Sequence, residues 1–386
     1  MDYFLTEEQQ MIKDVCRQIV EEHIKPVRAE LDEKEQFPHE VMKAIAQADL
    51  FGLIIPEEYG GLGGGCMENV VAVEELSRGC VGISTSFAAT FLGIYPILLY
   101  GSEEQKSRYL TRVAQGECLA AFALTESAAG SDASAITTEA RKEGDYYIIN
   151  GSKQWITNGG EAGVYTVIAI TDRSKGPRGA SAFIVEPTDP GFSVGKKESK
   201  MGIRASATAE LIFNNCRIPA DRLIGREGLG FVIAMRTFDL SRPGVGAQAV
   251  GVAQAALDEA AAFARVRKQF GRPIITFQAV AHMLADMATK VEAARALVYS
   301  VARYIDSGAK DISKVSAMAK LFPSDVAMEV TTNAVQILGG HGYMREYPVE
   351  KMMRDAKILQ IYEGTNQIQR NVIGQELNKE YGRKKH

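Results

Sequence analysis

The sequence predicts an α+β fold, in which a helical domain, a β domain and a second helical domain follow one another along the chain. Apolar residues recur at the helical period near both ends of the chain, whereas short β-branched and aromatic runs fill the middle. We expect an N-terminal α-helical domain at residues 1–118, a middle β domain at 119–227 and a C-terminal helical bundle domain at 228–386. A chain of 386 residues is long enough for three such units.

Two capping boxes mark helix starts in the N-terminal domain. Thr6 with Gln9, and Ser102 with Gln105, have the spacing in which each side chain bonds the other residue's backbone N–H. Between them lies PEEYGGLGGG (residues 56–65), which matches neither GxGxxG nor GxxxxGK. We therefore expect a flexible or tight connection there, and no phosphate-binding loop.

The middle domain is expected to be a small antiparallel sandwich or barrel. The runs YYIING, SKQWIT, VYTVIAIT, SAFIVE and AELIFNN have the composition of strands, and turn signals such as Asn150-Gly151 and DPG (residues 189–191) separate them. In the C-terminal domain, FQAVAHMLADMATKVEAARALVYSVARYI (residues 277–305) places its apolar residues on one stripe. Several helices of this kind predict a four-helix bundle.

Composition excludes several classes of function. The formal net charge is −4 without a basic patch, so nucleic acid is not an expected partner. Five scattered cysteines without a CxxC pair predict ordinary thiols, and no His, Cys and carboxylate cluster has metal-ligand spacing. No secretory signal is visible, and the longest apolar stretch, residues 87–100, is expected to be too short for a membrane span. These features predict a cytoplasmic protein without a metal.

The segment ILQIYEGTNQIQRNVI (residues 358–373) places Glu363 and Gly364 after an apolar run. One interpretation is a solvated turn at a helix end, because glycine commonly follows a helix in the left-handed conformation. The other is a desolvated carboxylate whose pKa rises towards neutrality, so that it acts as a general base. The segment alone leaves both interpretations open.

Five motifs resemble those of the acyl-CoA dehydrogenase family, and they occur in that family's order with similar gaps. They are LTESAAGSD (124–132), KQWITNGG (153–160), RKQFGRPI (267–274), AVQILGGHGY (334–343) and YPVEKMMRDAKILQIYEGTNQIQR (347–370). The resemblance implies the acyl-CoA dehydrogenase fold, with FAD in each subunit of a homotetramer. It also implies an acyl-CoA substrate, a role in fatty acid or carboxylic acid degradation, and an electron-transfer flavoprotein as electron acceptor.

The resemblance also implies which residue is the base. In the short- and medium-chain branches of the family the base lies in the YEGT motif, which here contains Glu363. Other branches place it at the position of Ser241, and serine cannot serve as a carboxylate base. Glu363 is therefore expected to remove the α-proton while the β-hydrogen leaves as hydride to the flavin N5, and its own N–H is expected to bond the thioester carbonyl. Gly364 then leaves room for the thioester.

The remaining site residues are implied by their places in the same motifs. The expected contacts to the flavin ring are Phe122, Leu124, Thr125, Ser131, Trp155, Ile156, Thr157, Thr365 and Gln367. The expected contacts to FAD across a subunit interface are Arg267, Gln269, Phe270 and Gln278, and those to its adenylate part are Gln336, Gly339 and Gly340. The expected substrate contacts are Thr85, Ala88, Ala89, Leu92, Ser131, Phe238, Asp239, Leu240, Ser241, Arg242, Val245, Tyr362 and Gly364.

The sequence leaves the substrate and some functions open. Gly244 and Gly246, opposite Ala88 and Ala89, predict a wide and short cavity for a short, branched, aryl or alicyclic acyl-CoA; a loose helix start after Pro243 is the structural alternative. An acyl-CoA oxidase, an enoyl-CoA reductase and a non-catalytic acyl-CoA-binding scaffold are the competing functions on the same fold.

Overall fold

The computed structural model describes residues 3–383 and confirms the predicted order of a helical part, a β part and a second helical part. The N-terminal helices are α1 (Glu7–Ile19), α2 (Arg28–Glu33), α3 (His39–Gln47), α4 (Cys66–Gly79), α5 (Val81–Tyr100) and α6 (Glu103–Ala114). The strands of the middle part are β1 (Leu119–Ala123), β2 (Glu139–Glu143), β3 (Tyr146–Thr157), β4 (Ala162–Ile170), β5 (Ala180–Val185), β6 (Phe192–Lys197), β7 (Thr208–Pro219) and β8 (Leu223–Ile224).

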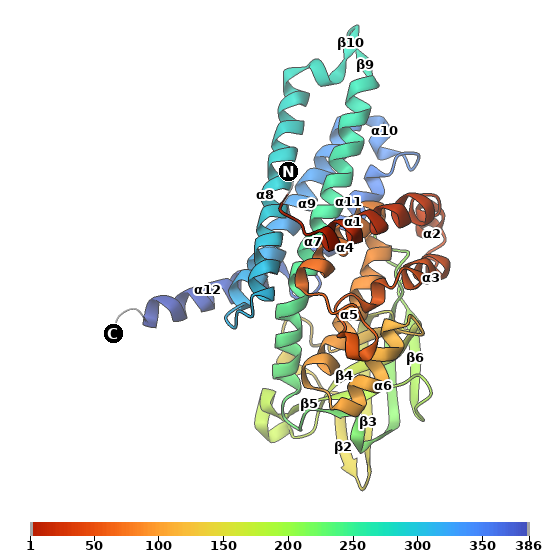
Figure 1. Ribbon diagram of the computed structural model, residues 1–386, viewed down its shortest axis with the longest axis vertical. Coiled ribbons are helices and arrows are strands. Elements are labelled where there is room, and N and C mark those ends of the chain that lie inside the picture. The colour runs from red at the N-terminus through yellow and green to blue at the C-terminus, as the bar shows by residue number, and fades with distance from the viewer. Residues whose placement is uncertain (1–2, 384–386) are drawn as a thin grey trace.

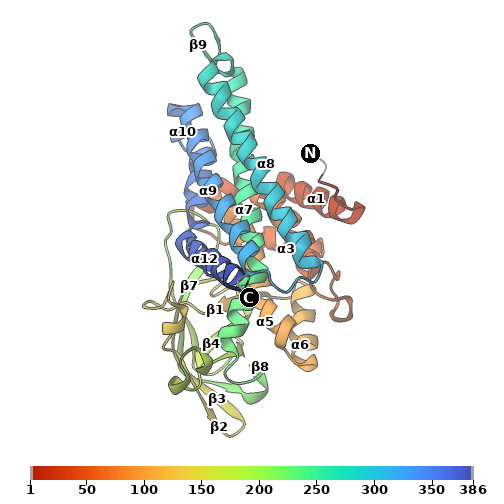
Figure 2. The same cartoon turned by 90° about the vertical axis from the view of Figure 1, so that its left-hand side faces the viewer.

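The C-terminal part consists of long helices and one small hairpin. Its elements are α7 (Gly230–Val266), β9 (Lys268–Gln269), β10 (Arg272–Pro273), α8 (Gln278–Asp306), α9 (Ser313–Leu338), α10 (Gly340–Tyr343), α11 (Val349–Ile358) and α12 (Asn366–Arg383). In Figure 1, α7, α8 and α9 run along the long axis, the β part lies at one end and the β9–β10 hairpin at the other. Helix α12 projects sideways from this body in Figure 1, and in Figure 2, turned by 90°, it lies in front of the body.

The middle part is one eight-stranded sheet in the order β6-β7-β3-β2-β4-β5-β8, with β1 added beside β4. Most pairs are antiparallel, as predicted, but β1 and β2 both pair with β4 in parallel, so the sheet is mixed. A parallel pair needs a long connection, and residues 124–161, which include β2 and β3, supply it between β1 and β4.

One of the two predicted turns is wrong. Asn150-Gly151 lies inside β3, where the register with β7 shifts at a bulge. Gly151 has a φ of +140°, and a Cβ there would lie 2.6 Å from Thr138 Oγ1, so glycine is needed for close approach and not for a reversal. The other turn is present, since Phe192 N donates to Asp189 O between β5 and β6.

The N-terminal helices begin where the capping boxes predict. Both reciprocal hydrogen bonds are present at Thr6 and at Ser102. The glycine-rich segment between them is tight: Gly64 N donates to Leu53 O at 2.8 Å, and a Cβ on Gly61 would lie 2.0 Å from Ile55 O. The glycines there permit close packing of two chain segments.

Helix α5 differs from its prediction. It begins six residues before the expected apolar stretch (87–100), and its 20 residues are by length and composition enough to cross a bilayer. However, 83% of its most apolar window is buried inside the protein, and Thr166 Oγ1 of β4 donates to Gly93 O in its middle. Among residues 3–383 it is the one helix with such length and composition, and its burial is that of a core helix.

Helix α7 lies at the centre of the molecule, and its glycines allow other helices to approach it. A Cβ on Gly246 would lie 2.1 Å from Ala319 O of α9, and one on Gly251 would lie 2.3 Å from Glu74 O of α4. The interpretation of Gly246 as a residue that widens an acyl cavity is therefore wrong. Gly244 has only Asn69 Nδ2 nearby, at 3.7 Å.

Candidate active site

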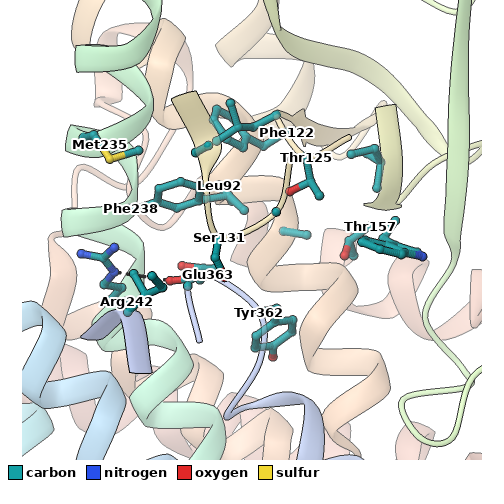
Figure 3. A pocket seen from close by; sticks show the side chains of 18 of the residues that line it. Leu92, Phe122, Thr125, Ser131, Thr157, Met235, Phe238, Arg242, Tyr362 and Glu363 are labelled. Carbon is teal, nitrogen blue, oxygen red and sulfur yellow. Dashed lines mark hydrogen bonds between the residues drawn. The ribbon is translucent and has the colours of Figure 1, made fainter. Parts of the chain in front are cut away.

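A cavity of about 330 Å³ lies where α5, α7, the sheet and the turn between α11 and α12 meet. Figure 3 shows Met235, Phe238 and Arg242 entering it from α7, and Thr125 and Thr157 from the β part. Of the predicted site residues, it is lined by Thr85, Ala88, Ala89, Leu92, Phe122, Leu124, Thr125, Ser131, Trp155, Ile156, Thr157, Phe238, Arg242, Tyr362, Glu363 and Gly364. The structure thus brings together residues from five separate segments of the sequence.

Glu363 contributes a carboxylate to this cavity from a turn with unusual backbone conformation. Glu363 has a φ of +51° and Gly364 a φ of +89°, so two successive residues are left-handed. A non-glycine residue in this region costs about 1–3 kcal/mol and persists only where its surroundings hold it. Ser241 Oγ of α7 donates to Glu363 Oε2 at 2.5 Å. Burial raises the pKa of Glu363, while the Ser241 hydroxyl and the nearby charges of Arg242 and Lys320 oppose that rise.

Three side chains bond the carbonyl groups of this turn. Arg242 Nε donates to Glu363 O at 3.5 Å, and Lys320 Nζ donates to Gly364 O at 2.8 Å. Gln369 Nε2 donates to both carbonyls, at 3.1 and 2.9 Å. In contrast, within residues 3–383 neither the N–H of Glu363 nor that of Gly364 has a hydrogen-bond acceptor. Two donors of the turn that carries Glu363 are therefore available to a ligand.

A polar chain closes one side of the cavity. Tyr362 OH donates to Gln248 Oε1 at 2.5 Å, and Gln248 Nε2 donates to Thr85 Oγ1 at 3.1 Å. Gln248 and Thr85 are buried, so these bonds satisfy groups that have no access to water. An apolar chain that displaced them would leave buried polar groups unpaired, at about 1–3 kcal/mol for each group.

Arg242 is held by an acidic partner on its own helix. Its Nη1 donates to Asp239 Oδ1 at 3.1 Å, and Asp239 Oδ2 accepts from Ser313 Oγ at 2.5 Å. Burial lowers the pKa of Arg242 and raises that of Asp239, and their mutual attraction opposes both changes. Asp239 therefore positions the guanidinium beside the cavity and does not itself line it.

On the β side, Trp155 is exposed and strained. Its side chain is 55% exposed, and its φ of +58° falls where the pairing of β3 with β7 is interrupted. Two residues earlier, Lys153 is fully buried and donates to Leu124 O at 3.0 Å and to Glu126 Oε1 at 2.7 Å. This ion pair fixes the segment that carries Thr125, because Glu126 also accepts from the backbone N–H of Thr137 and Thr138.

The second group of predicted cofactor residues lies elsewhere and is exposed. Arg267, Gln269, Phe270 and Gln278 surround the β9–β10 hairpin, and Gln336, Gly339 and Gly340 lie at the C-terminal end of α9. The rings of Phe263 and His341 are 5.4 Å apart, so both sets lie at one end of the molecule. About 36 Å of α7, at about 1.5 Å per residue, separates Val266 there from Arg242 at the cavity. The two groups therefore belong to different sites of one chain.

Several predicted residues do not line the cavity. Leu240 and Val245 pack in the core, Thr365 Oγ1 accepts from Ile368 N at the start of α12, and Gln367 is exposed. Other lining residues were not predicted: Gly130, Asp132, Ala133, Ser134, Phe231, Met235, Gln248 and Ile368. Phe231 and Met235 could have been found, because they precede Phe238 and Arg242 at the helical spacing of seven.

Comparisons with known proteins agree with this architecture. Family models described as the N-terminal, middle and C-terminal domains of acyl-CoA dehydrogenase match residues 6–117, 121–216 and 228–378. The chain therefore belongs to the acyl-CoA dehydrogenase family. Members are oxidoreductases that act on CH–CH donors, and FAD is the family's cofactor.

Three relatives illustrate the range of the family near this sequence. "Probable acyl-CoA dehydrogenase FadE25" of Mycobacterium tuberculosis is 51% identical, over 97% of this chain and 96% of that protein. "Acyl-CoA dehydrogenase, short-chain specific" of Clostridium acetobutylicum is 49% identical, over 97% and 98%. "Acryloyl-CoA reductase (NADH)" of Anaerotignum propionicum is 48% identical, over 98% and 96%.

Two solved structures superimpose closely. A chain in a structure described as the electron transferring flavoprotein of Acidaminococcus fermentans has a TM-score of 0.96 and 51% identity, over 98% of this chain and 99% of that chain. Butyryl-CoA dehydrogenase from Megasphaera elsdenii has a TM-score of 0.96 and 46% identity, over 98% and 100%.

Proposed function

We propose that this protein removes two hydrogens from the α- and β-carbons of a short acyl-CoA thioester, with Glu363 as the base. The observation that carries the proposal is the setting of Glu363: a carboxylate that lines the cavity, whose pKa burial raises, on a turn whose N–H groups have no acceptor among residues 3–383. A raised pKa makes the carboxylate a stronger base, and the free N–H groups suit the oxygen on which negative charge develops.

The chain's residues divide the work between proton removal and charge stabilisation. Glu363 would accept the α-proton as its C–H bond breaks, and the charge left on the thioester oxygen would be stabilised by the N–H of Glu363. Ser241 keeps the carboxylate in one orientation by its hydrogen bond. When bound, FAD supplies the two-electron acceptor to which the β-hydrogen leaves as hydride. The product is then the 2-enoyl-CoA.

Two features of this structure fit FAD. The β side of the cavity offers Trp155 together with the hydroxyl groups of Thr125, Ser131 and Thr157, and these residues would contact the flavin ring. At the other end of the molecule, Phe270 is 93% exposed beside Arg267, an arrangement that suits a partner surface. We propose that this end reaches the FAD of another subunit in a homotetramer, because within one chain the hairpin residues lie far from the cavity.

Cavity size and polarity favour a short acyl group. A cavity of about 330 Å³ must take part of the cofactor as well as the acyl chain, and the bonds of Tyr362, Gln248 and Thr85 close one side. Straight or branched short chains fit this description. The expectation of an aryl or alicyclic substrate rested mainly on a cavity widened by two glycines. That support is lost, because Gly246 faces α9 and Gly244 does not line the cavity.

The direction of the reaction has a specific competitor. The relative named acryloyl-CoA reductase favours the reverse reaction as a second candidate. For the forward direction we propose an electron-transfer flavoprotein as acceptor, supported by the A. fermentans structure. An oxidase would differ in the rate at which the reduced flavin reacts with oxygen.

The five cysteines are free thiols, which suits the cytoplasm as the location of this protein.

Anaerobic bleaching of the purified yellow enzyme tests the proposal. Butyryl-, isobutyryl-, phenylpropionyl-, cyclohexanecarbonyl- and palmitoyl-CoA are mixed with the protein, and the loss of visible flavin absorbance is followed. We expect butyryl-CoA to bleach the flavin fastest. Bleaching by none of them, or fastest bleaching by palmitoyl-CoA, would contradict the proposed function or its substrate class. The rates at which air and an electron-transfer flavoprotein reoxidise the reduced flavin are then compared. Faster reoxidation by air would indicate an oxidase and not a dehydrogenase.

A further inference from the structure

Lys320 is a buried lysine that the reaction itself does not require. It lies on α9 with no exposed surface, and its Nζ donates to Gly364 O at 2.8 Å and to Asn366 Oδ1 at 2.9 Å. Both acceptors belong to the segment that follows Glu363 directly. A fully buried lysine is rare unless it is paired, and no carboxylate of residues 3–383 forms an ion pair with Lys320.

We propose that Lys320 is a positioning residue for Glu363. The ammonium group of Lys320 holds the left-handed turn in place and stabilises the ionised carboxylate of Glu363 from the side of α9. The inference rests on the proposed role of Glu363 as the base. It assigns to α9 a part in the reaction, although α9 contributes no residue to the cavity lining.

The first argument is geometric. Two successive left-handed residues are strained, so contacts must over-determine their conformation. The bond from Lys320 to Gly364 O fixes the orientation of that carbonyl, and its bond to Asn366 Oδ1 fixes the first residue of α12. Asn366 is itself buried, with its Nδ2 donating to Ser324 Oγ at 2.9 Å and to Asp325 Oδ1 at 2.7 Å. Helix α9 thus holds both ends of the segment 364–366.

The second argument is electrostatic. The charged groups that face Lys320 are Glu363 on the turn, Arg242 on α7 and Asp325 on α9. Asp325 is partly neutralised by Arg370, whose Nη2 lies 2.9 Å from it. Burial lowers the pKa of Lys320 to about 7, while attraction by Glu363 opposes that decrease. The same attraction lowers the pKa of Glu363, so each charge favours the other.

These arguments predict that loss of Lys320 lowers the rate without lowering the stability of the fold. Lys320→Met removes a buried ammonium group, whose loss of hydration is costly, and fills its place with an apolar chain of similar length. Gly364 O keeps its bond from Gln369, and Asn366 Oδ1 keeps its contact with Ser324, so neither acceptor is left unpaired. The variant is therefore expected to fold, keep its FAD and retain its melting temperature. A purely structural lysine would show no loss of rate without a loss of stability.

The test compares wild type, Lys320→Met, Lys320→Gln and the matched control Lys314→Met, which changes a partly exposed lysine at the start of the same helix. With butyryl-CoA we expect Lys320→Met to lower the limiting rate of flavin reduction on the order of 10²-fold, with little change in KM, because a small misplacement of a catalytic group costs that much. The acidic limb of its kcat/KM profile should move to higher pH, since a cation that favours the ionised Glu363 is lost.

A second readout does not depend on turnover. Peptide-level hydrogen exchange of the segment 359–369 should be faster in Lys320→Met than in wild type, and unchanged in Lys314→Met. Lys320→Gln removes the charge but keeps a donor, so its acidic limb should move while its exchange stays closer to wild type. Wild-type rate, pH profile and exchange in Lys320→Met would overturn the proposal, as would unfolding of both Lys320 variants. Failure of wild type to bleach would instead contradict the proposed function, while the exchange result would still test the positioning.

Discussion

Ser241 Oγ donates to Glu363 Oε2 at 2.5 Å, although the two residues lie 122 positions apart in the sequence. The bond joins the first third of α7 to the turn between α11 and α12. It stabilises the charged form of the carboxylate and so lowers the pKa that burial raises. Serine at this position cannot be a base, but here it donates to the carboxylate of the proposed one.

Ser241→Ala is predicted to make the enzyme more sensitive to acid. Loss of the donor raises the pKa of Glu363, so more of the base is protonated at acidic pH, and kcat/KM falls there more than at alkaline pH. At alkaline pH the loss should be about tenfold or less, the size of one hydrogen bond to a charged group. The measurement is kcat/KM for butyryl-CoA across the pH range. An acidic limb that does not move to higher pH would contradict this role.

Two glycines of α7 provide a matched pair for stability. Gly246→Ala should destabilise the fold by about 1–3 kcal/mol or more, because its Cβ would lie 2.1 Å from Ala319 O in a packed interface. Gly244→Ala meets only Asn69 Nδ2 at 3.7 Å, and alanine is about 1 kcal/mol better than glycine inside a helix, so stability should rise. Thermal unfolding of both variants checks the prediction. Equal effects of the two substitutions would show that α7 and α9 do not pack as described.

Arg267→Ala is predicted to weaken retention of FAD and, with it, the oligomer. Arg267 is exposed at the hairpin end, far along α7 from the chain's own cavity, so its proposed target is the cofactor of a neighbouring subunit. Cofactor and interface then stabilise each other by linkage. Flavin content after dialysis and mass by light scattering are measured, with Lys268→Ala as the neighbouring control. A fully loaded tetramer in Arg267→Ala would refute the proposal.

Gln248→Ala is predicted to lengthen the acyl chain that the enzyme accepts. The substitution removes the centre of the polar chain between Tyr362 and Thr85 and opens volume beside the cavity. The ratio of flavin reduction by octanoyl-CoA to that by butyryl-CoA should therefore increase. If the ratio stays at the wild-type value while butyryl-CoA is still oxidised, another part of the wall limits chain length.

Much of the fold could be read from the sequence because local patterns determined it. The capping boxes at Thr6 and Ser102 fixed helix starts by bonds within four residues, and these are present. Asn150-Gly151 does not reverse the chain. A bulge and a hairpin turn use the same residues, and only the packing of Thr138 against Gly151 distinguishes them. The parallel pairing of β1 with β4 is likewise a long-range contact without a local signal.

Some residues of the candidate site have a signal in the sequence, and others are placed there only by the tertiary structure. Glu363 could be singled out because a carboxylate after an apolar run is unusual and because the motif around it resembles a known one. Phe231 and Met235 could have been found from helical spacing alone. Lys320 and Gln248 could not, since a lysine or glutamine in an amphipathic helix is ordinary until tertiary structure buries it beside the turn or the cavity wall.

The most direct test of the account is anaerobic flavin reduction by butyryl-CoA in Glu363→Gln. Glutamine preserves the shape of the side chain and the backbone N–H but cannot accept the α-proton, and general-base catalysis is typically worth ~10²–10⁴-fold. We predict that the variant stays yellow, binds butyryl-CoA as wild type does, and loses flavin reduction by a factor in that range. Bleaching at a near wild-type rate would show that the base lies elsewhere, and would contradict the central claim.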